Sequence, residues 1–182
     1  PMLNLESLLP ALERIHDAAG IALGARRITV STSGYPEHIA RLAEAAHPYQ
    51  LAVSLHAADD ALRRRLVPTA QATVRDIVAA AAHYGRIRGR EVTFEVVLLA
   101  DVNDRPRDAT LLARCLEDVR ATVNLIPWNP VERIPDLRRP SRHQVDAFAE
   151  SLREKGLKVT VRRQRGADRS AACGQLRLHS AS

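Results

Sequence analysis

The sequence predicts an α/β fold, namely a partial (β/α) barrel of parallel strands. Amphipathic helical segments alternate strictly with short apolar segments along the 182 residues, and such alternation favours right-handed crossovers and a parallel sheet. Five apolar segments can be counted, whereas a closed barrel of this kind normally has eight strands. Because the first segment is helical and its preceding strand is absent, we expect the missing strands on the N-terminal side.

The first third of the chain begins with a helix. Pro10 lies inside this segment, so we expect the helix either to kink there or to begin close to it. A strand over residues 27–31 follows, then a helix opened by Pro36, and a second strand over residues 51–55. The apolar residues that share one face of the first helix are Leu5, Leu8, Leu9, Leu12 and Ile15.

Two capping patterns mark helix starts in the rest of the chain. Thr73 with Asp76, and Ser141 with Gln144, have the spacing at which two residues cap the first helical turn reciprocally. Gly156 then ends the last helix. A further helix lies between the two capped ones. Three strands alternate with these helices, over residues 92–99, 122–126 and 157–161.

Polar residues lie at the C-terminal ends of three of the predicted strands. In parallel α/β proteins the ligand site lies at the C-terminal ends of the strands, so these residues are candidates for binding. The first strand runs into Ser31, Thr32, Ser33 and Gly34, the second ends in Ser54, Leu55 and His56, and the fourth ends in Pro127, Trp128, Asn129 and Pro130. Plainer interpretations stay open, because residues 31–34 fit an ordinary turn and a lone His56 is more often structural than functional.

The chain has two cysteines, Cys115 and Cys173, too few for a disulfide framework, which favours a reducing compartment. Cys115 falls on the apolar face of a predicted helix, so we interpret it as a core residue. Cys173 follows three arginines in residues 162–165, whose positive charge favours the nucleophilic thiolate. An inert cysteine near the chain end is the alternative. Two thiolates are also fewer than an iron–sulfur cluster normally needs.

The charge balance suits a polyanionic partner. Lys and Arg number 27 against 21 Asp and Glu, giving +6, and such an excess fits RNA phosphates as well as it fits an arginine-rich coding bias. Aromatic residues make up 3%, which argues against a base-stacking platform. No apolar run reaches the roughly 18 residues of a membrane span, and the first residues do not follow the order of a secretory signal. We expect a cytoplasmic protein.

Six stretches of the sequence together carry a family resemblance. They are Ser31-Thr32-Ser33-Gly34, Ser54-Leu55-His56-Ala57, Val102-Asn103-Asp104, Asn124-Leu125-Ile126-Pro127-Trp128-Asn129-Pro130, Arg165-Gly166 and Ala171-Ala172-Cys173-Gly174-Gln175-Leu176. In this order and spacing the chain resembles the radical S-adenosylmethionine (SAM) methyltransferases that modify adenine in 23S ribosomal RNA (rRNA) and transfer RNA (tRNA). The fourth and sixth stretches in combination are highly specific, and each shorter stretch alone is weak.

The resemblance implies that residues 1–182 are the C-terminal portion of a radical SAM core domain, with a methyl-carrier cysteine in the C-terminal tail. Cys173 would be the catalytic residue that takes a methyl group from SAM before radical chemistry delivers it to carbon 2 of adenine. The implied cofactors are SAM and a 4Fe-4S cluster of the parent enzyme, and the implied partners are 23S rRNA, tRNA and an electron donor. The residues implied to contact SAM are Ser31, Ser54, Leu55, His56 and Asn129.

The sequence departs from the family pattern in several places. The cluster motif of three cysteines, C-x-x-x-C-x-x-C, lies upstream in the family and is absent here, and no resolving cysteine is evident. The chain begins with Pro1, where the family has Gly-Glu-Pro, and Asp168-Arg169 stands where the family usually has Asp-Ile. We therefore expect the 182 residues to hold no metal and to be inactive by themselves.

Other functions stay open at this point. A related branch of the family methylates carbon 8 of adenine, and neither the carbon atom nor the preference for rRNA or tRNA is decided by a residue here. The positive charge also fits a cluster-free RNA-binding module or pseudoenzyme. An unrelated barrel-type metabolic enzyme is the third possibility, and it predicts no affinity for RNA.

Overall fold

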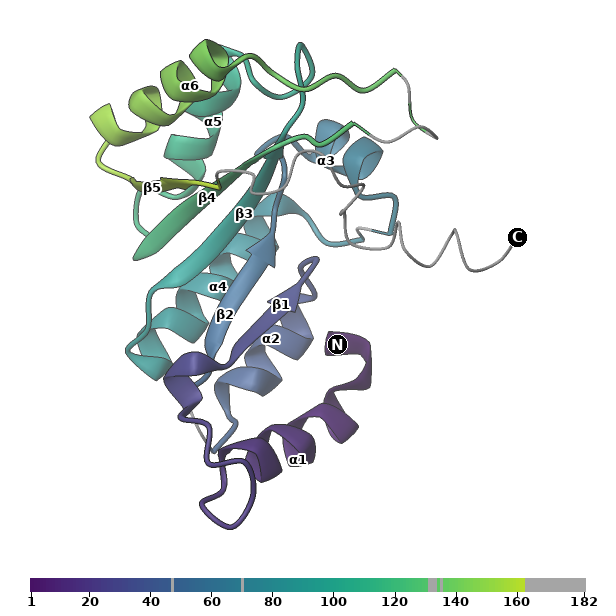
Figure 1. The fold of residues 1–182 in the computed structure, drawn as a ribbon, viewed down its shortest axis with the longest axis vertical. Helices are drawn as coiled ribbons and strands as arrows, with labels where there is room; N and C mark the ends of the chain where they lie inside the picture. Colours follow the sequence, from purple (N-terminus) through teal and green to yellow (C-terminus); the bar gives the residue numbers. More distant parts are fainter. Residues whose placement is uncertain (47, 70, 131–133, 135, 163–182) are drawn as a thin grey trace.

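The protein is described by a computed structural model, which covers residues 1–46, 48–69, 71–130, 134 and 136–162. Within these residues five strands form one parallel sheet, and their order in space is their order in the sequence (Figure 1). The predicted α/β alternation and the count of five strands are confirmed. The strands are β1 (Thr29–Thr32), β2 (Gln50–Ser54), β3 (Val92–Leu98), β4 (Ala121–Pro127) and β5 (Lys158–Val161).

Six α-helices and two short 3-10 helices are seen in the described residues. They are η1 (Met2–Asn4), α1 (Leu5–His16), η2 (Ala25–Arg27), α2 (Pro36–Ala43), α3 (Asp60–Leu66), α4 (Val74–Arg88), α5 (Pro106–Cys115) and α6 (Arg142–Glu154). The sequence analysis did not predict α3. Its one fully buried residue is an arginine, Arg63, while Leu62 and Leu66 are half-buried, so the apolar signal for this helix is short. Pro10 lies inside α1.

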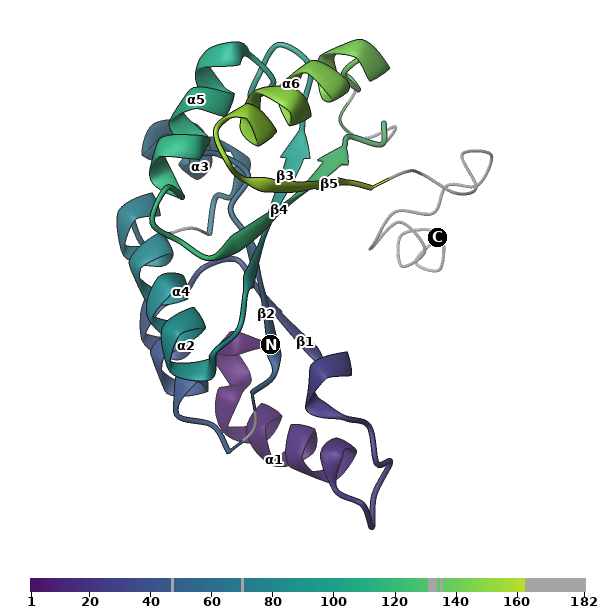
Figure 2. The same ribbon diagram turned by 90° about the vertical axis from the view of Figure 1, so that its left-hand side faces the viewer.

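The sheet order contains no reversal, so successive strands are added in one direction, as they are in a (β/α) barrel. Figure 2 shows α2 and α4 along one side of the strands, and these two helices pack against each other. In β3 the residues alternate strictly between buried and half-buried positions. We call the sheet face that carries Thr93, Glu95 and Val97 the open face, because these side chains keep part of their solvent exposure.

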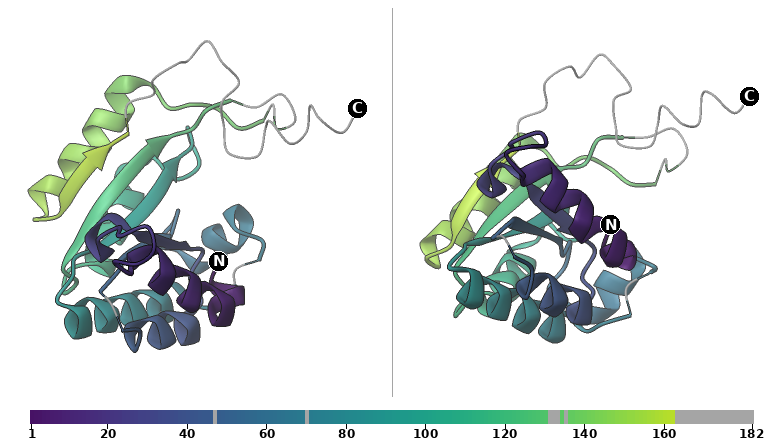
Figure 3. Two further views of the ribbon diagram at one scale, coloured as in Figure 1. Left: turned by 60° about the horizontal axis from the view of Figure 1, so that its bottom comes forward. Right: turned by 90° about the horizontal axis from the view of Figure 1, so that it is seen from below.

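The hydrophobic core lies between the other sheet face and the helices. Ile39 and Leu42 of α2 and Ile77 of α4 are fully buried in it, and each contributes roughly 1.5–3 kcal/mol relative to an exposed side chain. Gly34, in the turn between β1 and α2, lies directly against Ile77, since a Cβ atom at Gly34 would be 2.7 Å from the Ile77 Cδ1 atom. The turn after β1 is therefore packed against α4. Figure 3 shows the blue and teal helices α2 and α4 together on one side of the sheet.

The predicted helix starts are found at α4 and α6. The Ser141 hydroxyl accepts a hydrogen bond from Gln144 N at 3.2 Å, and Gln144 Oε1 accepts one from Ser141 N at 2.8 Å, so the second capping box is confirmed. At α4 the Thr73 hydroxyl accepts from Asp76 N but donates to the Asp76 carboxylate.

None of the helices in the described part of the chain has the length and apolar content of a membrane span.

Candidate functional site

A row of polar side chains crosses the open face, from the last residue of β2 to the middle of β3 and β4 and on to β5. The strand register pairs Ser54 with Glu95, Glu95 with Asn124, and Asn124 with Thr160. The Ser54 hydroxyl donates to Glu95 Oε2 over 3.4 Å, and the Thr160 hydroxyl donates to Asn124 Oδ1 over 3.1 Å. Sequence analysis missed Glu95, because its place beside Ser54 depends on the register between strands far apart in the chain.

Glu95 is a half-buried carboxylate whose charge is not neutralised locally. Among the described residues no Lys, Arg or His forms an ion pair with it. A half-buried carboxylate is stabilised by a nearby positive charge. The open face therefore offers a site that is complementary to a cationic ligand group.

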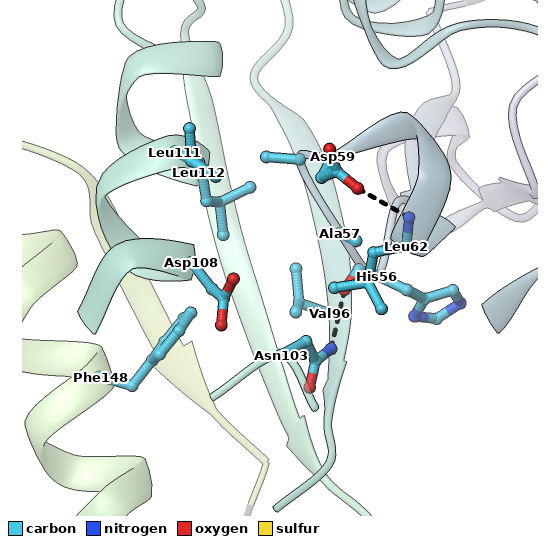
Figure 4. A pocket seen from close by; sticks show the side chains of 11 residues that line it. His56, Ala57, Asp59, Leu62, Val96, Asn103, Asp108, Leu111, Leu112 and Phe148 are labelled. Atoms are coloured by element: carbon cyan, nitrogen blue, oxygen red, sulfur yellow. Dashed lines mark hydrogen bonds between the residues drawn. The ribbon is translucent and has the colours of Figure 1, made fainter. Parts of the chain in front are cut away.

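His56 lies just beyond β2 with a backbone φ of +63°, a conformation that is uncommon for residues other than glycine. Its ring is held by β3, because Val97 N donates to His56 Nδ1 at 3.2 Å. Since Nδ1 accepts this bond, the proton of the neutral ring is assigned to Nε2. In Figure 4 the ring points away from Leu112 and Phe148, which line the helix side of the sheet.

The charge state of His56 follows from its surroundings. Burial, and secondarily the positive charge of Arg63, lower the pKa of His56 from 6.5 to about 4. At neutral pH the ring is therefore uncharged. It presents Nε2–H as a hydrogen-bond donor, and no acceptor in the described part of the chain takes this hydrogen.

Arg63 of α3 links this histidine to the turn after β1. The Arg63 side chain is 1% exposed, and its Nη2 donates to the backbone carbonyl of Ser33. Burial lowers the pKa of this guanidinium. Sequence analysis missed Arg63, because a run of three arginines resembles a solvated charged segment and carries no signal of burial.

The remaining predicted SAM-contact residues are distributed as follows. Ser31 is exposed in β1, between the buried residues Val30 and Thr32. Asn129 is half-buried just beyond β4. The Leu55 side chain is fully buried, so it lies in the core and not on the open face. The structure thus brings Ser54 and His56 to one strand end, and Cys173 lies outside the described residues.

Two hollows lie near this strand end, a small cavity and a larger groove. A small cavity of about 10 Å³ lies between the His56 turn and helices α5 and α6 (Figure 4), enough for about one water molecule. A groove of about 530 Å³ lies between α3 and α5. Three arginines and three aspartates line it, so it has no excess of positive charge: Arg65, Arg105, Arg107, Asp59, Asp101 and Asp108.

The described residues do not fit a 4Fe-4S cluster. Within them, no group of three His, Cys, Asp or Glu side chains is arranged to hold a metal ion, and the whole chain has two cysteines, fewer than such clusters require. Cys115 is half-buried on α5, and burial raises the pKa of its thiol to about 11. It therefore remains a protonated core thiol, in agreement with its predicted role.

Comparisons with curated proteins identify relatives of high identity. A protein of Symbiobacterium thermophilum named probable dual-specificity RNA methyltransferase RlmN is 47% identical over 178 residues, which are 97% of this chain and 48% of that protein. A protein of the same name from Thermus thermophilus is 46% identical over 98% of this chain and 50% of its own length. The chain thus spans about half the length of these relatives. No family model matches it.

Solved structures agree with this relationship. A radical SAM methyltransferase from Sphaerobacter thermophilus superposes with a TM-score of 0.91 and 45% identity over 96% of this chain and 51% of that one. A domain of pyruvate-formate lyase-activating enzyme from Bacteroides vulgatus has a TM-score of 0.69 at 18% identity, over 90% of this chain and 94% of that one. The second likeness concerns the fold alone. The resemblance and the partial-barrel fold predicted from the sequence are confirmed.

Proposed function

The chain is homologous to the dual-specificity RNA methyltransferases over about half of their length, and on this premise we propose that it forms the part of a radical SAM RNA methyltransferase that holds SAM. When bound, SAM supplies the methyl group. The proposal concerns the open face at the ends of β1, β2 and β4. The residues assigned to contact SAM are Ser31, Ser54, Leu55, His56 and Asn129.

Two groups carry this proposal: the neutral ring of His56, and the Glu95 carboxylate, which forms no ion pair with a Lys, Arg or His among the described residues. His56 offers Nε2–H toward an acceptor such as an adenine nitrogen or a carboxylate. Glu95 lies in register with Ser54 and complements the positive charges of the sulfonium and the amino group. Val97 N holds the His56 ring and the strand register places Glu95 beside Ser54, so the site is preorganised before SAM binds. Because the Leu55 side chain is buried, any contact from this residue comes from its backbone.

The finer chemistry rests on the family resemblance. We propose that the Cys173 sulfur, after losing its proton, takes the methyl group of one SAM molecule, with S-adenosylhomocysteine as the leaving group. Carbon 2 of adenine in 23S rRNA and tRNA is the proposed destination. The arginines upstream of Cys173 favour its thiolate. A cytoplasmic location and an electron donor for the parent enzyme remain part of this proposal.

The described residues do not fit a 4Fe-4S cluster, and this leads to a second expectation. We expect the 182 residues alone to be inactive, because they contain two cysteines and no cluster motif. The test is to reconstitute the purified chain with iron and sulfide and to assay SAM-dependent methylation of a 23S rRNA fragment. Methylated adenine in the product would contradict this expectation.

Binding of SAM is the direct test of the proposed function. Isothermal titration of the chain with SAM should give one site, and His56→Ala should weaken it about tenfold through the loss of one buried hydrogen bond. His83→Ala is the matched control, because His83 is exposed on α4. A chain that binds RNA but not SAM would instead fit a cluster-free RNA-binding module.

A further inference from the structure

The loop after β3 contains the Val-Asn-Asp motif, residues 102–104, to which neither the sequence nor the proposed function assigns a role. The loop is closed by Asp104, whose Oδ1 accepts a hydrogen bond from Asp101 N at 2.8 Å. The other carboxylate oxygen accepts from Gln144 Nε2 at 3.2 Å. Since Gln144 is part of the capping box of α6, Asp104 fastens the loop to that helix.

Asn103 uses its whole amide group in hydrogen bonds. Its Nδ2 donates to the carbonyl oxygen of His56 at 2.8 Å and to that of Val97 at 2.7 Å (Figure 4). Its Oδ1 accepts from Leu99 N at 2.8 Å. Two carbonyl oxygens beside Nδ2 and one N–H beside Oδ1 leave a single possible orientation of the amide. The side chain is 2% exposed, so water does not substitute for these partners.

These bonds decide how His56 is held. The backbone N–H of His56 donates to Glu95 O at 3.2 Å, its carbonyl accepts from Asn103, and its ring accepts from Val97 N. A left-handed residue other than glycine persists only where its surroundings determine its conformation. Asn103 donates to the carbonyl oxygens of both His56 and Val97. Because Val97 N holds the His56 ring, Asn103 couples the backbone of His56 to the residue that orients its ring.

We propose that Asn103 is a positioning residue, which acts through His56 by fixing its left-handed backbone and the direction of its Nε2–H toward the cofactor. The proposal rests on the proposed function, because His56 is one of the residues assigned to contact SAM. It gives the Val-Asn-Asp motif two separate tasks. Asn103 serves the site, and Asp104 fastens the loop to α6.

The first test follows His56 itself. Nitrogen-15 NMR of the full chain should show the wild-type ring neutral, with the proton on Nε2. In Asn103→Asp and Asn103→Ala the ring should lose its single tautomer. In Asn103→Ala, which adds no charge, the pKa of His56 should also rise from about 4 toward its ordinary value, because a ring that is no longer held against Val97 N is less buried. Asp104→Asn is the matched control, from the same buried loop, and should leave the His56 signals unchanged. Arg63, the charged neighbour of the ring, is kept in every variant.

The second test measures SAM affinity of the same proteins by titration calorimetry. Both Asn103 variants should raise the dissociation constant about tenfold, and adding His56→Ala to Asn103→Ala should cost little more, because the two residues act as one unit. Asp104→Asn should stay near the wild-type value. If Asn103→Ala lowers the melting temperature but leaves the His56 tautomer and the SAM affinity unchanged, Asn103 is merely structural and the inference is wrong. If the His56 signals respond while the wild-type chain binds no SAM, the proposed function is wrong, and the cofactor part of the inference fails with it.

Discussion

Arg63 donates a hydrogen bond from a fully buried guanidinium to the backbone carbonyl of Ser33. This contact joins α3 to the turn after β1, and the same arginine lowers the pKa of His56. One side chain thus connects the ends of two neighbouring strands, which carry Ser31 and His56. After burial, which is the larger cause, the charge of Arg63 is the second cause of the low pKa of His56.

Replacing this arginine should raise the pKa of His56. In Arg63→Met the positive charge is gone, but burial, the larger cause of the shift, remains. The pKa of His56 should therefore rise from about 4 and stay below its ordinary value of 6.5. An NMR titration measures it, with Arg64→Met as control because Arg64 is exposed on the same helix. An unchanged pKa would contradict the role assigned to Arg63.

The stability of the protein should fall as the pH is lowered through the range between the two pKa values of His56. The pKa of His56 is about 4 in the folded protein, against the ordinary value of 6.5 that applies to the unfolded chain. As the pH falls, the unfolded chain therefore binds a proton before the folded protein does, and stability is lost from pH 6.5 down to pH 4. The loss approaches about 1.4 kcal/mol per pH unit within this window, or roughly 3 kcal/mol in total. Urea unfolding at pH 7 and pH 4.5 measures it.

His56→Asn is the comparison for this experiment, because asparagine does not titrate and tolerates a left-handed backbone. The stability difference between wild type and variant should shrink as the pH falls. Equal pH dependence in the two proteins would mean that the His56 ring is charged or accessible in the folded state, contrary to its contact with Val97 N.

Gly34→Ala should destabilise the fold more than Gly89→Ala. Both glycines have positive φ, +96° and +60°, but an added Cβ meets Ile77 at Gly34 and nothing within 4 Å at Gly89. We expect a cost of about 1 kcal/mol at Gly89 and of roughly 2–4 kcal/mol at Gly34. Chemical denaturation compares them, and Ile77→Val should recover part of the loss at Gly34. Equal costs would show that the turn after β1 is not packed against α4.

Glu95→Gln should weaken the binding of SAM more than that of S-adenosylhomocysteine, which lacks the sulfonium charge. A difference of about tenfold between the two losses corresponds to one charge-assisted contact. Glu91→Gln is the control, because the Glu91 carboxylate already pairs with Lys158 at 2.7 Å. Equal losses for both ligands would show that Glu95 does not face the sulfonium.

Much of the fold was predictable from local sequence, because helix starts and apolar strands leave short-range signals. The Ser141–Gln144 box lies at the start of α6 as predicted. Helix α3 was missed because its buried position is Arg63 rather than an apolar residue. The expected strand over residues 27–31 is observed at Thr29–Thr32, a shift that follows from pairing with β2.

The candidate site was predictable only in part. Polar residues at the ends of β1, β2 and β4 mark the candidate site, and the family resemblance selects five residues there: Ser31, Ser54, Leu55, His56 and Asn129. The contacts of Glu95 with Ser54 and of His56 with Val97 and Asn103 depend on strand register over about forty residues, which no local pattern encodes. The role of Cys173 lies outside the described residues and stays a prediction.

If the open face beside His56 holds SAM, an NMR titration of the isotope-labelled chain with SAM should reveal it. Amide shifts should concentrate at Ser54, His56, Glu95 and Asn103, with little change in α1. Shifts confined to the groove around Arg65 and Arg107, or no shift at saturating SAM, would contradict it.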